Sequence, residues 1–201
     1  MPALCIYASS SDAIDSKWRE TTRAAADTLA AAGFDLVWGC GAVGLMGELG
    51  RGFRAAGRRL TGVIPRKLNL PGIVFPDPDE LVLTDTMSER KQEMISRAEA
   101  FLALPGGFGT LEEILEVITL RQLGYLDKPI ALLNSHGFYD SLLAQFELFF
   151  TERYAKESFR KLYLVSDDPT AITAYLLAAE HIPLPDKWFK ESLDGRADIP
   201  E

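Results

Sequence analysis

Three segments rich in glycine or serine are the places where this chain is best suited to bind a charged ligand. They are Ser9-Ser10-Ser11, the turn from Gly39 to Gly47, and Pro105-Gly106-Gly107-Phe108-Gly109-Thr110. Glycine allows a ligand to approach the backbone closely, and the free N–H groups at the start of a helix attract anions. Together the segments predict a site for one phosphate-bearing ligand, although each alone is also consistent with a tight turn.

The turn from Gly39 to Gly44 matches the pattern G-x-G-x-x-G, which is typical of dinucleotide-binding proteins. The match alone is weak evidence, because the turn follows the second apolar run rather than the first. No acidic residue lies about twenty residues further on to bind a ribose. Arg58 and Arg59 stand there instead and suit a phosphorylated ribose, so an NADP-dependent oxidoreductase is one alternative.

Two charged residues near these segments have more than one interpretation. Thr86-x-x-Glu89 and Thr110-x-x-Glu113 both match the capping box, in which the two side chains satisfy free N–H groups at a helix start. From the residues alone, Glu113 is consistent with helix capping. Arg90, directly after Glu89, is consistent with an exposed position on a capped helix.

The composition excludes several classes of protein. With 201 residues, 47% of them hydrophobic and 25% charged, the chain has the make-up of one globular domain. A net charge of −8 argues against a partner that is a nucleic acid or an anionic membrane. Two cysteines and two histidines predict neither a disulfide framework nor a zinc site. No apolar run reaches membrane-spanning length and the first residues lack a signal-peptide pattern, so we expect a cytoplasmic protein.

Six basic residues gather between positions 49 and 76, where there is no acid. This stretch is consistent with a solvated helix face and loop, or with a local attraction for an anionic ligand. Cys40, in a glycine-rich loop without a basic neighbour, is expected to be unreactive. His136 is expected to be structural or solvent-exposed.

Short apolar runs that alternate with amphipathic stretches predict the elements that position these residues. Such runs, each followed by a helix, indicate a parallel sheet covered on both faces. The expected fold class is α/β, a Rossmann-like doubly wound parallel sheet with helices on both faces. We expect one domain over 1–181 and a C-terminal tail over 182–201. The first helix is expected to be capped by Ser11 or Asp12. Strands are expected at 3–8, 34–38, 59–64, 81–84, 100–104, 129–133 and 162–165, and helices at 13–32, 45–56, 87–98, 110–123, 139–154 and 169–179.

Three motifs in order resemble the LOG ("lonely guy") family, which is also labelled possible lysine decarboxylase. They are Val43-Gly44-Leu45-Met46-Gly47, Met87-Ser88-Glu89-Arg90-Lys91, and Pro105-Gly106-Gly107-Phe108-Gly109-Thr110-Leu111-Glu112-Glu113. The family pattern is P-G-G-x-G-T-x-x-E, preceded by an E-R-K element and a glycine turn that ends G-L-M-G. The resemblance runs from about Leu4 to about Leu176. Cys40, Ala42 and Ser88 depart from the pattern, which puts the identity of the substrate in doubt more than the reaction.

The resemblance implies that the domain binds a nucleotide and is a phosphoribohydrolase. Such an enzyme hydrolyses the N-glycosidic bond of a nucleoside 5′-monophosphate, a cytokinin riboside monophosphate or AMP, to the free base and ribose 5-phosphate. It implies a homodimer and neither a cofactor nor a metal. The decarboxylase label has no support, because nothing marks a lysine that would bind pyridoxal phosphate. A non-catalytic carrier of a nucleotide or of the molybdenum cofactor, with the same fold, is the second alternative.

The match to the family motifs assigns the residues of the site. Glu113 and Arg90 are implied to be catalytic: the carboxylate stabilises positive charge at the anomeric carbon or activates water, and the guanidinium binds phosphate or ribose oxygens. The turn before Glu113 is implied to hold the 5′-phosphate at the helix N-terminus that begins at Thr110. The residues implied to bind substrate are Ser9, Ser10, Gly41, Met46, Met87, Lys91, Gly106, Gly107, Gly109 and Thr110.

Overall fold

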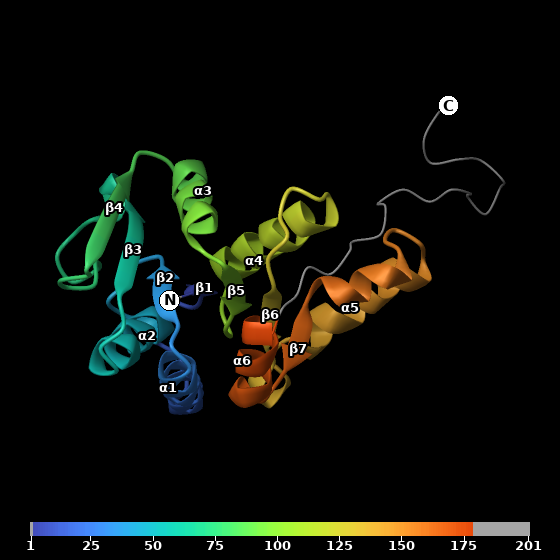
Figure 1. Cartoon of the computed structure of the whole chain (residues 1–201), viewed down its shortest axis with the longest axis horizontal. Helices are drawn as coiled ribbons and strands as arrows, with labels where there is room; N and C mark the ends of the chain where they lie inside the picture. Colours follow the sequence, from blue (N-terminus) through green and yellow to red (C-terminus); the bar gives the residue numbers. More distant parts are fainter. Residues whose placement is uncertain (1, 179–201) are drawn as a thin grey trace.

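The computed structural model describes residues 2–178, and seven strands within them form one parallel sheet (Figure 1). The order across the sheet is β4-β3-β2-β1-β5-β6-β7. This confirms the predicted α/β fold with a parallel sheet; the expected tail over 182–201 lies outside the described residues. The strands are β1 (Ala3–Tyr7), β2 (Asp35–Trp38), β3 (Leu60–Pro65), β4 (Glu80–Thr84), β5 (Ala100–Ala103), β6 (Ile130–Leu133) and β7 (Leu164–Ser166).

The helices cover both faces of the sheet. In Figure 1, α1, α2 and α6 lie along the lower side of the sheet, and α3 and α4 lie along the upper side. Short 3₁₀ helices interrupt three of the loops: η1 (Arg66–Leu68), η2 (Ser135–Gly137) and η3 (Glu157–Leu162). The α-helices are α1 (Ser16–Ala31), α2 (Gly44–Ala55), α3 (Met87–Arg97), α4 (Phe108–Gln122), α5 (Asp140–Thr151) and α6 (Pro169–Ala178). Among the described residues, none of the helices has the length and apolar character needed to span a bilayer.

Strand β1 shows why the sheet reads as continuous apolar runs in the sequence. Its side chains alternate between the two faces, so Leu4 and Ile6 join the core beneath α1, α2 and α6, whereas Cys5 and Tyr7 join the core beneath α3 and α4. All four side chains are almost completely buried. Because both faces are covered, neither half of the alternation is polar.

The chain changes direction across the sheet between β1 and β5, and this places the loops that follow the two strands side by side. Tyr7 is paired with Ala103 at the carboxyl ends of these strands. The connection after β1 leads to α1 on one face, and the connection after β5 leads to α4 on the other. A crevice at such a point is the usual ligand site of an open α/β sheet.

Two helix starts differ from the predicted ones by more than one residue. Helix α1 begins at Ser16, because the Asp15 carboxylate accepts a hydrogen bond from the Lys17 N–H at 2.9 Å; the prediction of Ser11 or Asp12 as its cap is wrong. Helix α4 begins at Phe108, with Gly107 in an extended conformation as its N-cap. Thr110 is therefore inside the first turn rather than at the start of the helix.

A substitution in β3 tests the packing beneath the second glycine turn. A Cβ atom added at Gly62 would lie 2.2 Å from Sγ of Cys40, which is itself fully buried. We expect Gly62→Ala to lower the free energy of unfolding by about 1–3 kcal/mol through overpacking, measured by urea denaturation. Adding Cys40→Ala should recover only part of the loss, because it removes Sγ but keeps the Cys40 Cβ, which would lie 2.7 Å from the added atom. Equal losses with and without Cys40→Ala would contradict this.

Candidate active site

The Arg90 guanidinium on α3 and the Glu113 carboxylate on α4 meet beyond the carboxyl ends of the strands. Arg90 Nη1 lies 3.0 Å from Glu113 Oε1, and the two side chains are only 9% and 4% exposed. Arg90 Nε also donates to the carbonyl of Val63 in β3, at 3.2 Å. Both residues line a cavity of about 310 Å³. The alternatives of an exposed Arg90 and of a Glu113 that caps its helix are both wrong.

The sequence around Arg90 explains how its side chain reaches the sheet. Thr86 Oγ1 accepts a hydrogen bond from the Glu89 N–H at 3.1 Å, and Glu89 Oε2 accepts one from the Asp85 N–H at 2.9 Å. This confirms the predicted cap of α3. Arg90 and Met94, one turn apart, are the buried residues of this helix, so they share the face that packs on the sheet.

Gly39 makes room for the Arg90 side chain. A Cβ atom at this position would lie 1.9 Å from Arg90 Nη2. The guanidinium therefore lies directly against the backbone of the turn after β2. A residue with a side chain would fit here only if the guanidinium moved away from its present position.

Burial sets the protonation of Glu113. Removal from water raises the pKa of its carboxyl to about 7, although the charge of Arg90 lowers it. Glu112 adds to the rise and Lys91 opposes it. Both protonation states are thus populated near neutral pH, which is the condition for a side chain that moves a proton during a reaction.

The lining of the cavity comes from four segments that are far apart in the sequence. They are the segment after β1, the first turn of α2, Arg90 on α3, and the start of α4 as far as Glu113. Six of the predicted substrate-binding residues lie here together with Arg90 and Glu113. Ala8 and Ser11 also line the cavity, and neither was among the predicted substrate-binding residues. Ser11 does belong to the Ser9-Ser10-Ser11 segment, which the sequence indicates as suited to bind a charged ligand. The predicted residues in the lining are Ser9, Ser10, Met46, Gly107, Gly109 and Thr110.

The remaining predicted residues lie outside this lining. Gly41 packs under Met46, whose Sδ would be 2.8 Å from an added Cβ. Gly106 makes room for Thr110, whose Oγ1 would be 2.1 Å from an added Cβ, and it lines a neighbouring cavity of about 280 Å³. Met87, at the start of α3, is 46% exposed and not part of the cavity wall.

Lys91 binds two carboxylates of α4 instead of lining the cavity. Its Nζ pairs with Glu112, and it lies 3.0 Å from Glu116 Oε2. Arg90 and Lys91 are adjacent on α3, and together they form three ion pairs with carboxylates of α4. Lys91 thereby holds α3 against α4 beside the Arg90–Glu113 pair.

The two glycine turns differ in what occupies the adjoining helix N-terminus. Helix α4 has no side-chain cap within the described residues and no acid in its first turn, and Gly107, Gly109 and Thr110 at this helix start line the cavity. At α2, by contrast, the Gly44 N–H donates to Asp12 Oδ1 at 2.9 Å. The start of α4 is the one suited to an external anion, whereas a carboxylate of the protein itself fills the start of α2.

The basic residues between 49 and 76 are mostly paired with acids from elsewhere in the chain, as expected of a solvated surface. His136 is exposed and contacts the edge of Trp18, with ring centroids 5.3 Å apart. Cys40 is buried, which raises the pKa of its thiol to about 11 and keeps it protonated. The ion pairs of the basic stretch are Arg51–Glu48, Arg54–Asp79, Arg58–Asp35, Arg59–Glu80 and Arg66–Asp85.

Comparisons with known proteins agree on one family. A family model described as possible lysine decarboxylase matches residues 46–176. A probable cytokinin riboside 5′-monophosphate phosphoribohydrolase of Oryza sativa subsp. japonica is 39% identical over 183 residues, which are 91% of this chain and 86% of that protein. A cytokinin riboside 5′-monophosphate phosphoribohydrolase of Arabidopsis thaliana is 38% identical over 180 residues, which are 90% of this chain and 84% of that protein. The molybdenum cofactor carrier protein of Chlamydomonas reinhardtii shares the fold, with a TM-score of 0.66 at 22% identity over 89% of this chain and 99% of that chain.

The pKa of Glu113 provides a test of the site that needs no substrate. We expect Arg90→Met to raise it further above 7, because the guanidinium stabilises the carboxylate, and Lys91→Met to raise it less. Carbon NMR of labelled glutamate carboxyls measures the titration. Arg97→Met is the matched control, since Arg97, on the same helix, pairs with Glu80 and Glu93 and with no other acid of residues 2–178. A fall of the pKa in Arg90→Met would contradict the geometry.

Proposed function

The chain belongs to the LOG family, which is also described as possible lysine decarboxylase, and on this premise we propose that it is a phosphoribohydrolase. It hydrolyses the N-glycosidic bond of a nucleoside 5′-monophosphate, a cytokinin riboside monophosphate or AMP. The products are the free base and ribose 5-phosphate. The observation that carries the proposal is the buried Arg90–Glu113 pair at the wall of a cavity beside an uncapped helix N-terminus.

The 5′-phosphate binds at the start of α4. The backbone N–H groups there and the hydroxyl of Thr110 line the cavity, and the helix dipole favours a negative charge. Ser9 and Ser10 belong to the same lining and supply further hydroxyl groups. The net charge of −8 is no obstacle, because one nucleotide needs only a local set of donors.

Glu113 and Arg90 act on the ribose. Cleavage of a ribosyl C–N bond develops positive charge on the ring, as in glycoside hydrolysis, and the Glu113 carboxylate stabilises it. The same carboxylate accepts a proton from the attacking water, whose oxygen forms the new bond to the anomeric carbon. The base leaves with the bonding electron pair and takes up a proton. Arg90 binds the Glu113 carboxylate and presents its remaining N–H groups to ribose or phosphate oxygens.

The two alternatives receive less support. A dinucleotide oxidoreductase would place its pyrophosphate at the start of α2, but Asp12 occupies that position and would repel it. A carrier of a nucleotide or of the molybdenum cofactor does not need a buried carboxylate whose pKa lies near 7. The likeness to the carrier protein of Chlamydomonas reinhardtii extends to the fold alone.

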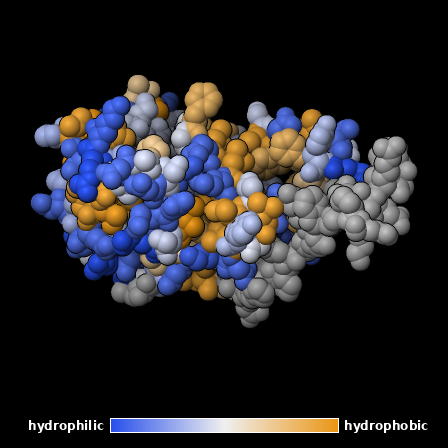
Figure 2. All heavy atoms as spheres, turned by 90° about the horizontal axis from the view of Figure 1, so that it is seen from above, coloured by the Kyte–Doolittle hydropathy of each residue, from blue (hydrophilic) through white to orange (hydrophobic). Residues whose placement is uncertain are grey.

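We also propose that the chain forms a homodimer in the cytoplasm. Figure 2 shows hydrophobic residues in patches among hydrophilic ones on the upper side of the molecule. On α4 and α5, Leu115 and Phe149 are both 37% exposed and border one apolar pocket of about 130 Å³. Light scattering coupled to size exclusion is expected to give the dimer mass. A monomer from Leu115→Glu with Phe149→Glu would place the interface here, and a monomeric wild type would refute the dimer.

The catalytic assignment is tested by substitution of the two charged residues. We expect Glu113→Gln to lower kcat by about 10²–10⁴-fold, the usual contribution of a general acid or base, and Arg90→Ala to lower kcat/KM strongly. Chromatography of the base released from AMP and from N6-isopentenyladenosine monophosphate measures both. Below pH 7 the wild-type kcat/KM should fall with decreasing pH, because protonation removes the Glu113 carboxylate.

Glu112→Gln is the matched control for Glu113→Gln. It makes the same chemical change on the neighbouring residue, which is 56% exposed and outside the cavity lining. We expect it to keep most of the activity at pH 8. Absence of base release from every nucleoside monophosphate by the wild type would refute the proposed function. Equal losses in the two variants would refute the role of Glu113.

A further inference from the structure

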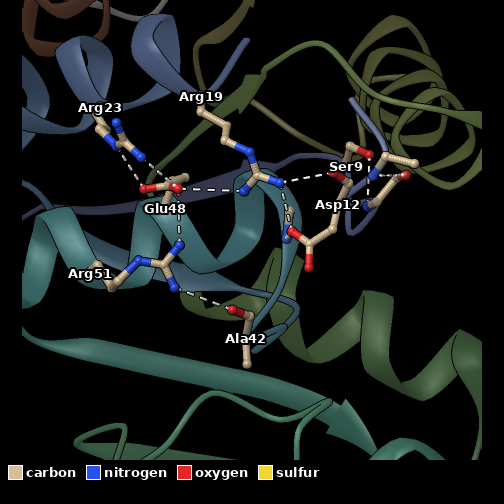
Figure 3. Close-up of polar contacts among 10 residues, drawn as sticks. Ser9, Asp12, Arg19, Arg23, Ala42, Glu48 and Arg51 are labelled. Atoms are coloured by element: carbon tan, nitrogen blue, oxygen red, sulfur yellow. Dashed lines mark hydrogen bonds and ion pairs between the residues drawn. The ribbon is translucent and has the colours of Figure 1, made fainter. Parts of the chain in front are cut away.

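Three arginines converge on one buried carboxylate beside the cavity, and no step of the proposed reaction uses them (Figure 3). Glu48, on α2, is 7% exposed and lies within 3.5 Å of Arg19, Arg23 and Arg51. Arg23 and Arg51 are more than half exposed, whereas Arg19 is 22% exposed. Arg19 is therefore the most enclosed of the three.

Arg19 differs from the other two in binding a second carboxylate. Its Nη1 lies 3.5 Å from Glu48 Oε1, while Nη2 donates to Asp12 Oδ1 at 2.8 Å and to the Asp12 carbonyl at 3.0 Å. One guanidinium thus joins α2 to the segment that follows β1. Among the described residues, Arg23 forms its hydrogen bonds with Glu48 alone, through Nε at 2.9 Å and Nη2 at 3.0 Å.

The segment that Arg19 holds carries one wall of the cavity. Ser9, Ser10 and Ser11 line the cavity directly before Asp12. The segment is bonded to the first turn of α2 at both ends: the Met46 N–H donates to the Ser9 carbonyl at 3.2 Å, and the Gly44 N–H donates to Asp12.

Gly44 lets these two backbones meet. It has a φ of +60°, and a Cβ atom there would lie 2.6 Å from the carbonyl carbon of Ser10. The wall is thus packed on α2 without intervening side chains. Its position depends on the Asp12 carboxylate remaining at the start of that helix.

The charges support a fixed arrangement. The hydrogen bonds from Arg19 and from the Gly44 N–H lower the pKa of Asp12, so this carboxyl stays ionised at neutral pH. An ionised carboxylate is the best partner for a helix N-terminus. Arg19 restrains it from one side and the helix from the other.

We propose that Arg19 is a positioning residue for the substrate: by holding Asp12 on the first turn of α2, it fixes Ser9–Ser11 as a wall of the Arg90–Glu113 cavity. The expected effect on KM rests on the proposed function. The restraint of the segment after β1 by Arg19 does not depend on that function.

Arg19→Met and Arg23→Met form a matched pair, because each removes one guanidinium from Glu48 and only the first releases Asp12. We expect Arg19→Met to raise KM for the nucleoside monophosphate by about tenfold with little change in kcat, since misplacement of a binding wall weakens substrate positioning. Arg23→Met should leave KM unchanged. Arg19→Lys, which keeps the charge but cannot bridge two carboxylates, should resemble Arg19→Met and serves if that variant does not fold.

Hydrogen exchange of the backbone amides of residues 9–13 supplies a readout independent of activity. Exchange should accelerate in Arg19→Met and not in Arg23→Met. If both variants change KM and exchange equally, or neither changes them, the positioning role is refuted. If the wild type releases no base but the exchange difference is found, the proposed function fails while the restraint of the segment by Arg19 stands.

Discussion

The burial of the Arg90–Glu113 ion pair is the constraint on which the rest of the site depends. Moving two charged groups out of water costs several kcal/mol for each, and a single pairing partner returns only part of it. The chain meets this cost with the 3.0 Å contact between the two groups and the hydrogen bond to Val63. Glycine at position 39 is a consequence, because any side chain there would displace the guanidinium.

The same burial gives Glu113 its chemical use. A solvent-exposed carboxyl has a pKa of about 4, so it would be ionised throughout the physiological range but would be a weak proton acceptor. Enclosure brings the pKa of Glu113 to about 7, and the Lys91 pairs with Glu112 and Glu116 hold the two helices together at this point. Under the proposed function, stability and reactivity oppose each other here: replacement of the pair by apolar residues would relieve the desolvation cost and remove the proposed catalytic groups.

Around this pair, the fold treats two similar helix starts in opposite ways. The start of α4 is left without a side-chain cap within the described residues and opens into the cavity, whereas the start of α2 holds the carboxylate of Asp12. A carboxylate of the same chain and a free anion compete for the N–H groups of a helix N-terminus. The carboxylate has the advantage, because its tethering gives it a higher effective concentration than the free anion. The G-x-G-x-x-G turn therefore packs against Ser9–Ser11, and the P-G-G-x-G-T turn is the one at which we propose that a phosphate binds.

The sequence by itself determined the seven strands, the order of strands and helices along the chain, and the loops that meet at the site. Buried parallel strands leave continuous apolar runs, and glycine turns after them are visible without any contact partner. Tertiary structure alone decided that α4 starts at Phe108, that Glu113 faces Arg90 rather than its own helix start, and that Lys91 turns to Glu112 and Glu116. The contacts of Glu113 and Lys91 depend on how α3 and α4 are rotated about their axes relative to each other. They also depend on partners that lie more than twenty residues away in the sequence. No local pattern records such contacts, because the desolvation that selects among them exists only once the two helices have packed.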